Sequence, residues 1–234
     1  SGPGGYVAAV RAAQLGKSVA VIERSEIGGI CLNWGCIPTK ALLKSAQAYT
    51  YARHAAEYGF EASDVKADIT KMVERSRGVA AQMSKGVEFL LKKNKITLIK
   101  GEGVLKSGHT VEVNDFEAGT RTVYEADHII LAVGSRANSL PFAPIDGERI
   151  ISYRQALVPE KLPKSLAVIG SGAIGSEFAF FYRSLGVEVY LIEYLDRLLP
   201  VEDDDVSAQI SRSFRKTGIK VMTAAQVKSV DTSG

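Results

Sequence analysis

The stretch SLAVIGSGAIGSEFAFFYRSLGVEVYLIEY, residues 165–194, carries the pattern that decides the fold. An apolar run ends at Gly170, and Gly172 and Gly175 complete G-x-G-x-x-G at the start of an apolar helical pattern. A further glycine precedes a second β-branched run, which ends at Glu193. This order predicts a strand–turn–helix–strand unit, in which the glycines permit a tight turn and the close approach of a pyrophosphate.

The glycine turn indicates a dinucleotide site. A phosphate would bind at the positive end of the helix dipole. Glu193 lies 18 residues past Gly175, where its carboxylate can accept hydrogen bonds from a ribose diol. A carboxylate there repels a 2′-phosphate, and the nearest following arginine is Arg197, so NAD is expected rather than NADP. The alternative is a βαβ turn without a ligand, against which the strand, the glycines and the acid argue together.

The same pattern occurs at the start of the chain. Residues 1–24, SGPGGYVAAVRAAQLGKSVAVIER, match residues 171–194 at a constant offset of 170 residues. The identical pairs are Ser1, Gly2, Gly5, Leu15, Gly16, Val19, Ile22 and Glu23 with Ser171, Gly172, Gly175, Leu185, Gly186, Val189, Ile192 and Glu193. Two dinucleotide sites in one chain indicate electron transfer between two different dinucleotides.

Between the two copies the sequence predicts first helices and then strands. Two amphipathic helical segments are expected within residues 36–93. Residues 95–135 read KITLIKGEGVL, HTVEVND and RTVYEADHIILAVGS around intervening turns, which predicts an antiparallel meander returning to a buried strand at 128–133. The Pro-containing segment 136–149 is the expected linker.

The expected fold class is α/β, with two Rossmann-like dinucleotide-binding units that combine a parallel sheet with helices and a small antiparallel meander. The expected boundaries are 1–140 for the first domain and 141–234 for the second, each incomplete. The second unit is expected to stop within a hairpin, at VKSVDTSG.

The composition excludes several classes of protein. It is 46% hydrophobic and 24% charged, with a net charge of +3 spread along the chain, so neither nucleic-acid binding nor a membrane span is expected. Two cysteines in a chain of this size indicate a reducing compartment. A cytoplasmic location is expected, or the mitochondrial matrix in a eukaryote.

The segment GGICLNWGCIPTK, residues 28–40, holds both cysteines of the chain, Cys31 and Cys36. Four interpretations are open: a metal site, a structural staple, buried spectator thiols and a redox pair. The absence of a nearby histidine and the C-x₄-C spacing argue against zinc. A reducing compartment and a very short loop argue against a staple. Spectator thiols and a redox pair remain.

The neighbouring residues favour a reactive dithiol. Pro38 suits the first turn of a helix, which places Cys36 near a helix N-terminus where the dipole favours a thiolate. Lys40 lies one turn further along the same face, and its ammonium favours the thiolate too, although a solvated helix lysine is the plain alternative. The backbone freedom that would bring Cys31 back toward Cys36 comes from Gly28, Gly29 and Gly35.

The segment GGICLNWGCIPTKALL, residues 28–43, resembles the redox-active disulfide segment of the flavin disulfide reductases, and most closely that of the dihydrolipoyl dehydrogenase family. The family pattern C-[LV]-N-x-G-C-[IV]-P is matched throughout. Leu32, Ile37 and Thr39 fit the lipoyl enzymes better than the glutathione or mercuric reductases. The resemblance extends over essentially all 234 residues, including AVGSRAN at 132–138.

The resemblance implies that FAD binds the first unit and NAD the second. For FAD it implies a pyrophosphate cradle formed by Gly2, Pro3, Gly4 and Gly5, and a ribose contact at Glu23. The further residues that would border FAD are Arg24, Gly29, Lys40, Gly103, Val133, Gly134 and Ser135. For NAD it implies Gly170, Ser171, Gly172, Ala173, Ile174, Gly175, Glu177 and Glu193, with Val227 beside the adenine. The implied catalytic residues are Cys31, Cys36, Lys40 and Glu177, with Glu177 pairing with Lys40.

The implied reaction is the oxidation of dihydrolipoyl groups on the lipoyl domains of a 2-oxo acid dehydrogenase complex, with reduction of NAD⁺. Cys31, as the more accessible sulfur, would exchange with the substrate, and Cys36 would be the flavin-side sulfur. Another flavin disulfide reductase, of the glutathione or mercuric type, is one alternative. A nucleotide-binding module without disulfide chemistry is the other.

The family also has regions that this sequence does not match. These are the opening strand and first glycine of the FAD turn, a closing FAD motif, and a C-terminal dimerisation domain with a His–Glu acid–base pair. The chain is therefore expected to be an internal fragment of a longer protein that forms a homodimer, with little or no lipoamide activity alone. His54, His109 and His128 match no catalytic motif.

Overall fold

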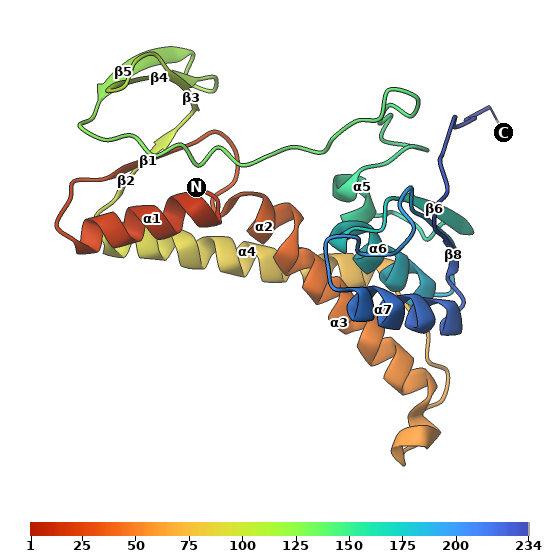
Figure 1. The fold of residues 1–234 in the computed structure, drawn as a ribbon. Helices are drawn as coiled ribbons and strands as arrows, with labels where there is room; N and C mark the ends of the chain where they lie inside the picture. The colour runs from red at the N-terminus through yellow and green to blue at the C-terminus, as the bar shows by residue number, and fades with distance from the viewer. Residues whose placement is uncertain (234) are drawn as a thin grey trace. The chain divides into compact units, whose positions relative to one another are not determined.

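The computed structural model describes residues 1–233, which form two compact units. The first unit contains residues 1–38 and 77–136, and the second contains residues 39–76 and those from 137 onward. The chain enters the second unit at residue 39 and returns to the first unit at residue 77. It enters the second unit again at residue 137, inside the expected linker. Figure 1 shows the elements in chain order.

The first unit contains one helix of twelve residues, one short helix and five strands: α1 (Pro3–Gln14), β1 (Ala20–Glu23), α2 (Gly29–Trp34), β2 (Thr97–Lys100), β3 (Glu102–Leu105), β4 (Thr110–Asp115) and β5 (Thr120–Glu125). Two long helices contain residues assigned to both units: α3 (Cys36–Arg53) and α4 (Ile69–Lys93). The second unit adds η1 (Ala55–Tyr58), α5 (Tyr153–Leu157), β6 (Ser165–Ile169), α6 (Ala173–Ser184), β7 (Glu188–Ile192), α7 (Asp204–Lys216) and β8 (Lys220–Met222).

The repeat predicted from the sequence is present in the backbone. Helices α1 and α6 begin and end at positions related by the offset of 170 residues. Their N-caps have nearly the same dihedral angles, with φ −64° and ψ −178° at Gly2 and φ −62° and ψ 179° at Gly172. Both helices are followed by a glycine in the left-handed region, Gly16 with φ 84° and Gly186 with φ 91°. The two copies therefore share the same turn–helix–strand structure.

In each unit the strand after the repeated helix pairs in parallel with a later strand. In the first unit β1 pairs with β2, and Glu23 lies opposite Lys100 at the carboxyl end. In the second unit β7 lies between β6 and β8, both parallel to it. The predicted α/β class with parallel sheets is confirmed.

The antiparallel meander contains only part of the segment assigned to it. Strands β3, β4 and β5 form the three-stranded antiparallel sheet, whereas β2 belongs to the parallel pair. The two sheets meet at Gly101, whose φ is 136° and where an added Cβ would lie 2.7 Å from the Asn114 carbonyl oxygen. Because only glycine fits this bend, KITLIKGEGVL divides into two strands of different sheets.

The predicted buried strand at residues 128–133 is wrong. The segment is extended but lies in no ladder with another described strand, and Ile130, Leu131 and Val133 are exposed. An apolar run becomes a strand only beside a partner that accepts its backbone hydrogen bonds, and β1 is paired only with β2 in the described residues.

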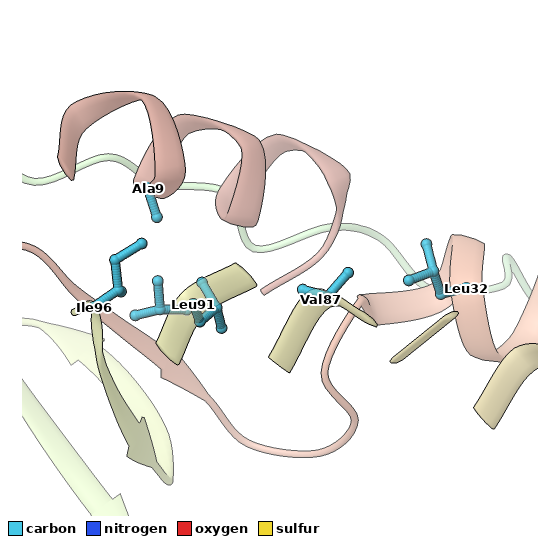
Figure 2. Close-up of a cluster of buried hydrophobic side chains, with 6 residues drawn as sticks. Ala9, Leu32, Val87, Leu91 and Ile96 are labelled. Carbon is cyan, nitrogen blue, oxygen red and sulfur yellow. The ribbon is translucent and has the colours of Figure 1, made fainter. Parts of the chain in front are cut away.

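The core of the first unit lies where α1, α2 and α4 meet β1 (Figure 2). It contains the buried residues Ala9, Val21, Leu32, Val87, Leu91 and Ile96. Leu32 lies in α2 between the two cysteines, so this core also anchors the dithiol segment.

The core of the second unit is built on α6, from which Phe178, Ala179, Phe181 and Tyr182 are buried. The Tyr182 hydroxyl donates to the Ala156 carbonyl oxygen at 2.9 Å, and burial raises the pKa of that phenol. This bond ties α5 to the helix that carries the second glycine turn. No helix among residues 1–233 is long and apolar enough to cross a membrane.

Candidate dinucleotide and dithiol sites

Cys31 and Cys36 form a disulfide, with their Cα atoms 4.8 Å apart. Cys31 lies in α2, and Cys36 is the first residue of α3, with Pro38 in its first turn as the sequence predicted. Gly35 ends α2 between them, and an added Cβ there would lie 3.1 Å from the Ile30 carbonyl oxygen. The disulfide supports the redox pair over two spectator thiols.

The relative exposure of the two cysteines differs from the expectation that Cys31 is the more accessible. Cys36 is exposed, whereas Cys31 is half-buried. The reason is packing, since Cys31 contacts the hydrophobic core of the first unit and Cys36 opens a helix.

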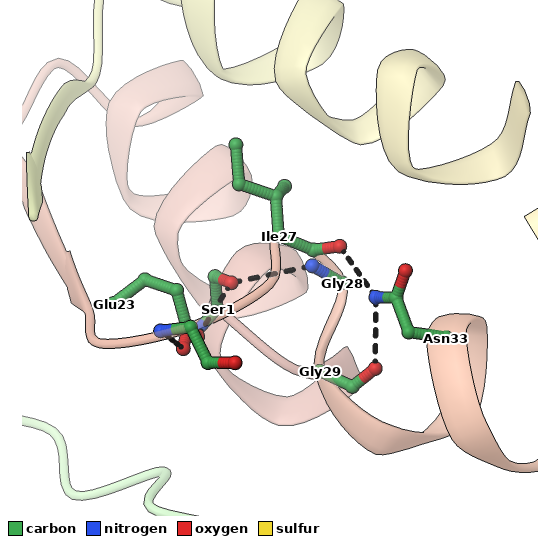
Figure 3. A network of polar contacts seen from close by, with 7 residues as sticks. Ser1, Glu23, Ile27, Gly28, Gly29 and Asn33 are labelled. Carbon is green, nitrogen blue, oxygen red and sulfur yellow. Dashed lines mark hydrogen bonds and ion pairs between the residues drawn. The ribbon is translucent and has the colours of Figure 1, made fainter. Parts of the chain in front are cut away.

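The residues between the cysteines are held by polar contacts (Figure 3). The buried Asn33 side chain donates to the Ile27 carbonyl oxygen at 2.9 Å and to the Gly29 carbonyl oxygen at 3.1 Å. Its own carbonyl oxygen accepts from the Ser84 hydroxyl at 2.9 Å. The loop is thereby tied to helix α4.

At the first glycine turn, Glu23 is held by three donors (Figure 3). Its Oε2 accepts from the Ser1 nitrogen at 2.8 Å and from the Ser1 hydroxyl at 2.7 Å, and its Oε1 accepts from the Ser25 N–H at 2.9 Å. Burial raises the pKa of Glu23, but the hydrogen bonds from Ser1 and Ser25 lower it more, so this pKa lies below its ordinary value. The carboxylate is therefore fixed in position and ionised at neutral pH.

A pocket of about 310 Å³ opens beside this carboxylate at the carboxyl ends of β1 and β2. Its walls carry acidic, basic and apolar side chains, including Glu23, Glu26, Lys85, Leu98 and Lys100. Ligands of open parallel sheets bind at this edge. The pocket and the oriented carboxylate fit the ribose end of a dinucleotide.

The glycines of the first turn lie close to other backbone segments. An added Cβ at Gly29, which has φ 62°, would lie 2.7 Å from the Gly2 Cα. An added Cβ at Gly5 would lie 3.6 Å from the Ala132 Cβ, so the AVGS segment runs over the turn. Gly103 of β3 faces Ile22 of β1. Arg24 forms an ion pair with Glu102 at 2.9 Å.

The remaining first-unit candidates, Val133, Gly134 and Ser135, lie in the extended segment after β5. Val133 is 87% exposed, and Gly134 has φ 70°. The structure thus gathers Gly2, Gly5, Glu23 and Gly29 closely and leaves the Val133–Ser135 turn open to solvent.

The second glycine turn repeats the arrangement of the first. Glu193 Oε2 accepts from the Ser171 N–H at 2.8 Å and from the Ser171 hydroxyl at 2.7 Å, and Oε1 accepts from the Leu195 N–H at 2.9 Å. Burial raises the pKa of Glu193, but the hydrogen bonds from Leu195 and Ser171 lower it by more, so this pKa lies below its ordinary value. Glu193 is 7% exposed.

Two glycines of this turn are required for different reasons. An added Cβ at Gly175 would lie 2.0 Å from the Gly170 carbonyl oxygen, so the packing of α6 against the turn demands glycine. At Gly172 an added Cβ meets no described atom within 4 Å, and φ is −62°, a value open to any residue. Neither packing nor backbone conformation therefore requires glycine at this helix N-terminus. A glycine there fits the close approach of a pyrophosphate. Ala173 and Ile174 form the first turn of α6.

Lys40 and Glu177 form an ion pair, as the resemblance implied. Both belong to the second unit, Lys40 on α3 and Glu177 on α6. The Lys40 side chain is 65% exposed and that of Glu177 is 29% exposed, so the pair lies at the surface of this unit.

The segment after β8 passes beside the Glu193 turn. The Ala225 N–H donates to the Glu193 carbonyl oxygen at 2.9 Å, and the half-buried Val227 follows two residues later. Arg197, the nearest arginine, forms an ion pair with Asp204 and donates to the Pro200 carbonyl oxygen at 3.1 Å. Its guanidinium is thus held by α7 and its preceding loop, which leaves the carboxylate as the dominant charge at the ribose position.

Sequence reasoning missed the residues that hold the redox loop, namely Asn33, Trp34, Arg77 and Ser84. Arg77 and Ser84 lie on α4, far from the cysteines in sequence. Only Asn33 lay at a specified position of a sequence pattern, C-[LV]-N-x-G-C-[IV]-P, and no sequence signal pointed to Arg77 or Ser84. Within residues 1–233, no cluster of three or more His, Cys, Asp or Glu side chains could hold a metal ion.

Two glycine-turn units and a disulfide at a helix N-terminus together define the class. The chain belongs to the pyridine nucleotide-disulphide oxidoreductase family, whose model matches residues 1–234. The resemblance inferred from the sequence is confirmed.

Among its relatives, the dihydrolipoyl dehydrogenase of Zymomonas mobilis is 47% identical over 229 residues, which are 98% of this chain and 49% of that protein. The mitochondrial dihydrolipoyl dehydrogenase of Pisum sativum is 42% identical over 235 residues, covering 100% of this chain and 47% of that protein. The chain spans about half the length of the curated relatives it matches.

Two solved structures are similar over nearly the whole chain. LpdA from Mycobacterium tuberculosis has a TM-score of 0.92 at 32% identity, covering 100% of this chain and 52% of that one. The HOCl-induced flavoprotein disulfide reductase RclA from Escherichia coli has a TM-score of 0.80 at 26% identity, covering 97% of this chain and 48% of that one.

Proposed function

We propose that the protein oxidises protein-bound dihydrolipoyl groups to lipoyl groups and reduces NAD⁺, using the Cys31–Cys36 disulfide and FAD. The observation that carries the proposal is the disulfide at the start of α3, beside a glycine-turn unit. Relatives at 42–47% identity are named dihydrolipoyl dehydrogenase, which supports this substrate over those of the glutathione and mercuric reductases.

The first half-reaction is a thiol–disulfide exchange. One thiolate of the dihydrolipoyl group attacks the Cys31–Cys36 bond to form a mixed disulfide, and the second substrate thiolate displaces the protein sulfur. The substrate leaves as a disulfide, and Cys31 and Cys36 hold the two electrons as a dithiol. The dipole of α3 and the Lys40 ammonium on the same helix favour the thiolate form of Cys36.

When bound, FAD supplies the carrier that accepts two electrons from the dithiol and passes a hydride equivalent to NAD⁺. The assignment of Cys31 to substrate exchange and Cys36 to the flavin side is part of the proposal. This assignment rests on the family resemblance, since Cys36 rather than Cys31 is the more exposed sulfur in the structure.

For FAD we propose residues 1–140 as the binding domain, with a pyrophosphate cradle, a ribose contact at Glu23 and a bordering set. The cradle is Gly2, Pro3, Gly4 and Gly5, and the border is Arg24, Gly29, Lys40, Gly103, Val133, Gly134 and Ser135. The pocket beside Glu23 and the close approach of Gly29 to Gly2 support this assignment.

For NAD we propose the domain 141–234, whose last residue lies outside the described part. Its contacts are Gly170 to Gly175, Glu177 and Glu193, with Val227 at the adenine. The fixed carboxylate of Glu193 supports NAD over NADP, because a 2′-phosphate would meet a buried negative charge. Lys40 and Glu177 act as a pair that orients charge near the reacting rings.

The proposed partners are the lipoyl domains of a 2-oxo acid dehydrogenase complex and a second copy of the chain in a homodimer. The proposed location is the cytoplasm, or the mitochondrial matrix in a eukaryote.

A comparison of the protein with its C36S variant tests the proposal. With dihydrolipoamide and NAD⁺ the full-length wild type, of which this chain is expected to be an internal fragment, should form NADH, and the full-length C36S variant should lose at least about a thousandfold in rate because the disulfide cannot form. FAD and NAD⁺ affinities measured on both proteins serve as the control, since serine leaves the glycine turns intact. Equal rates for the two proteins, or turnover of glutathione disulfide with NADPH but not of dihydrolipoamide, would refute the proposed substrate.

A further inference from the structure

We propose that Asn33 and Ser84 are positioning residues. Through hydrogen bonds outside the disulfide, they hold the end of α2 and Gly35, the segment between the cysteines, in the geometry that allows the disulfide to form, and so make Cys31–Cys36 harder to reduce. The inference rests on the proposed function, because it concerns how readily that redox pair accepts electrons.

The first hold is the Asn33 side chain, which is 6% exposed. Its two N–H groups donate backward to the carbonyl oxygens of Ile27 and Gly29, just before Cys31. A buried amide satisfied in this way fixes the chain on both sides of Cys31 (Figure 3).

The second hold is Ser84 on α4, whose hydroxyl donates to the Asn33 Oδ1 atom at 2.9 Å. This bond sets which way the amide points, because an amide turned over would place its N–H₂ group against the Ser84 hydroxyl and its oxygen against two carbonyl oxygens. Ser84 thus acts on the loop through Asn33.

A third hold acts at the middle of the loop. Arg77 of α4 donates to the Asn33 backbone carbonyl oxygen, and its guanidinium carbon lies 4.3 Å from the centre of the Trp34 ring. The Trp34 indole N–H in turn donates to Glu26 at 2.6 Å. Helix α4 therefore contacts two successive residues between the cysteines, Asn33 and Trp34.

These holds matter because the surrounding backbone is rich in glycine. Gly28 and Gly29 have φ of 92° and 62°, and Gly35 directly precedes Cys36. Without outside contacts, such a segment gains a large conformational freedom once the sulfur–sulfur bond is broken. Contacts that persist in the dithiol keep the two sulfurs together, which raises the effective concentration of one thiol at the other and favours the disulfide.

The test is the thiol–disulfide equilibrium of the full chain in glutathione buffers, followed by trapping and counting free thiols. Two glutathione thiols lose two electrons and two protons and form one glutathione disulfide, while the Cys31–Cys36 bond breaks, its two sulfurs take the electrons, and the protons pass to these sulfurs or to the solvent. In S84A the equilibrium constant for reduction should rise about three- to tenfold, because the less restrained dithiol has a lower effective concentration of one thiol at the other. N33A should show a larger rise, since it loses three bonds.

Two variants control for a purely structural effect. S84T keeps the hydroxyl and should restore the wild-type equilibrium. S76A removes a buried hydroxyl from the same helix, where Ser76 bonds the Val73 carbonyl oxygen of its own helix, and should leave the equilibrium unchanged. A loss of stability that acts on disulfide and dithiol alike does not move this constant.

The outcomes separate the two proposals. If the wild type equilibrates with glutathione and S84A stays within twofold of it, the positioning role is refuted and the redox pair stands. If the wild-type cysteines do not interconvert between dithiol and disulfide, both proposals fail.

Discussion

At the residue scale, the two glycine-turn units place a serine and a glutamate in the same relation. Ser1 with Glu23 and Ser171 with Glu193 are each 22 residues apart, and the hydroxyl donates to the carboxylate at 2.7 Å in both. The serine of the glycine turn therefore orients the carboxylate that ends the next strand. Such preorganisation lowers the cost of binding a ribose diol, because the acceptor needs no ordering when the ligand arrives.

The E193Q variant tests the energetic consequence of this arrangement. Because the pKa of Glu193 is lowered from 4.5 in the folded chain, its ionised form contributes stability that is present above pH 4.5 and is lost as the pH falls through the folded-state pKa. At pH 7, E193Q should be about 1 to 2 kcal/mol less stable than the wild type, since glutamine presents an amide where donors converge.

Urea unfolding at several pH values measures this difference, which should shrink below pH 4.5. E202Q, at an exposed glutamate of the same unit, should change stability by less than about 0.5 kcal/mol. A difference for E193Q that is independent of pH would show that the charge is not what stabilises the turn.

Residue identity could be predicted from sequence wherever a local pattern fixed it. Glu23 and Glu193 followed from their spacing to the glycines, and the Lys40–Glu177 ion pair followed from the family resemblance. Asn33, Arg77 and Ser84 could not be predicted in the same way, because their contacts join residues 44 to 51 positions apart with no motif linking them.

At the element scale, the glycine turns show which features of a strand–turn–helix are internal and which serve a ligand. G175A should lose about 3 kcal/mol of stability, because its Cβ would lie 2.0 Å from the Gly170 carbonyl oxygen and α6 would have to move. G172A should lose less than about 1 kcal/mol, since its Cβ points into open space among the described residues.

G172A, which should lose little stability, should nevertheless lose NAD⁺ affinity. In G172A the added methyl group occupies the approach of the pyrophosphate, so affinity should fall at least about tenfold in a protein that stays folded. Calorimetric titration of NAD⁺ and urea unfolding together measure both effects. An unchanged NAD⁺ affinity in G172A would show that the pyrophosphate does not bind at this turn.

The elements that could be predicted are those whose partners are local. Helix α3 begins at Cys36 and α6 at Ala173 because the glycines directly before them, Gly35 and Gly172, mark those ends in the sequence. The composition of segment 128–133 predicts a strand, yet the segment pairs with no strand of residues 1–233 and is largely exposed, because pairing depends on a neighbour elsewhere in the chain. The change of sheet at Gly101 likewise needs the positions of β1 and β4, which no local pattern contains.

At the scale of the whole molecule, one βα design serves two units, and each unit carries its own oriented carboxylate. The two dinucleotides should therefore bind independently. E23Q should lower FAD affinity about tenfold and leave NAD⁺ affinity unchanged, while G172A should do the reverse. Flavin fluorescence and NAD⁺ calorimetry on both variants measure the four affinities. An equal loss of both affinities in either variant would contradict two separate sites.

The central claim is that Cys31 and Cys36 pass electrons from a dithiol to a bound flavin. The most direct measurement is the visible spectrum of the FAD-loaded protein during anaerobic titration with dihydrolipoamide, compared with that of C36S. The wild type should gain a long-wavelength absorption band, as expected for a thiolate beside the flavin, and C36S should not. Identical spectra for the two proteins throughout the titration would contradict the claim.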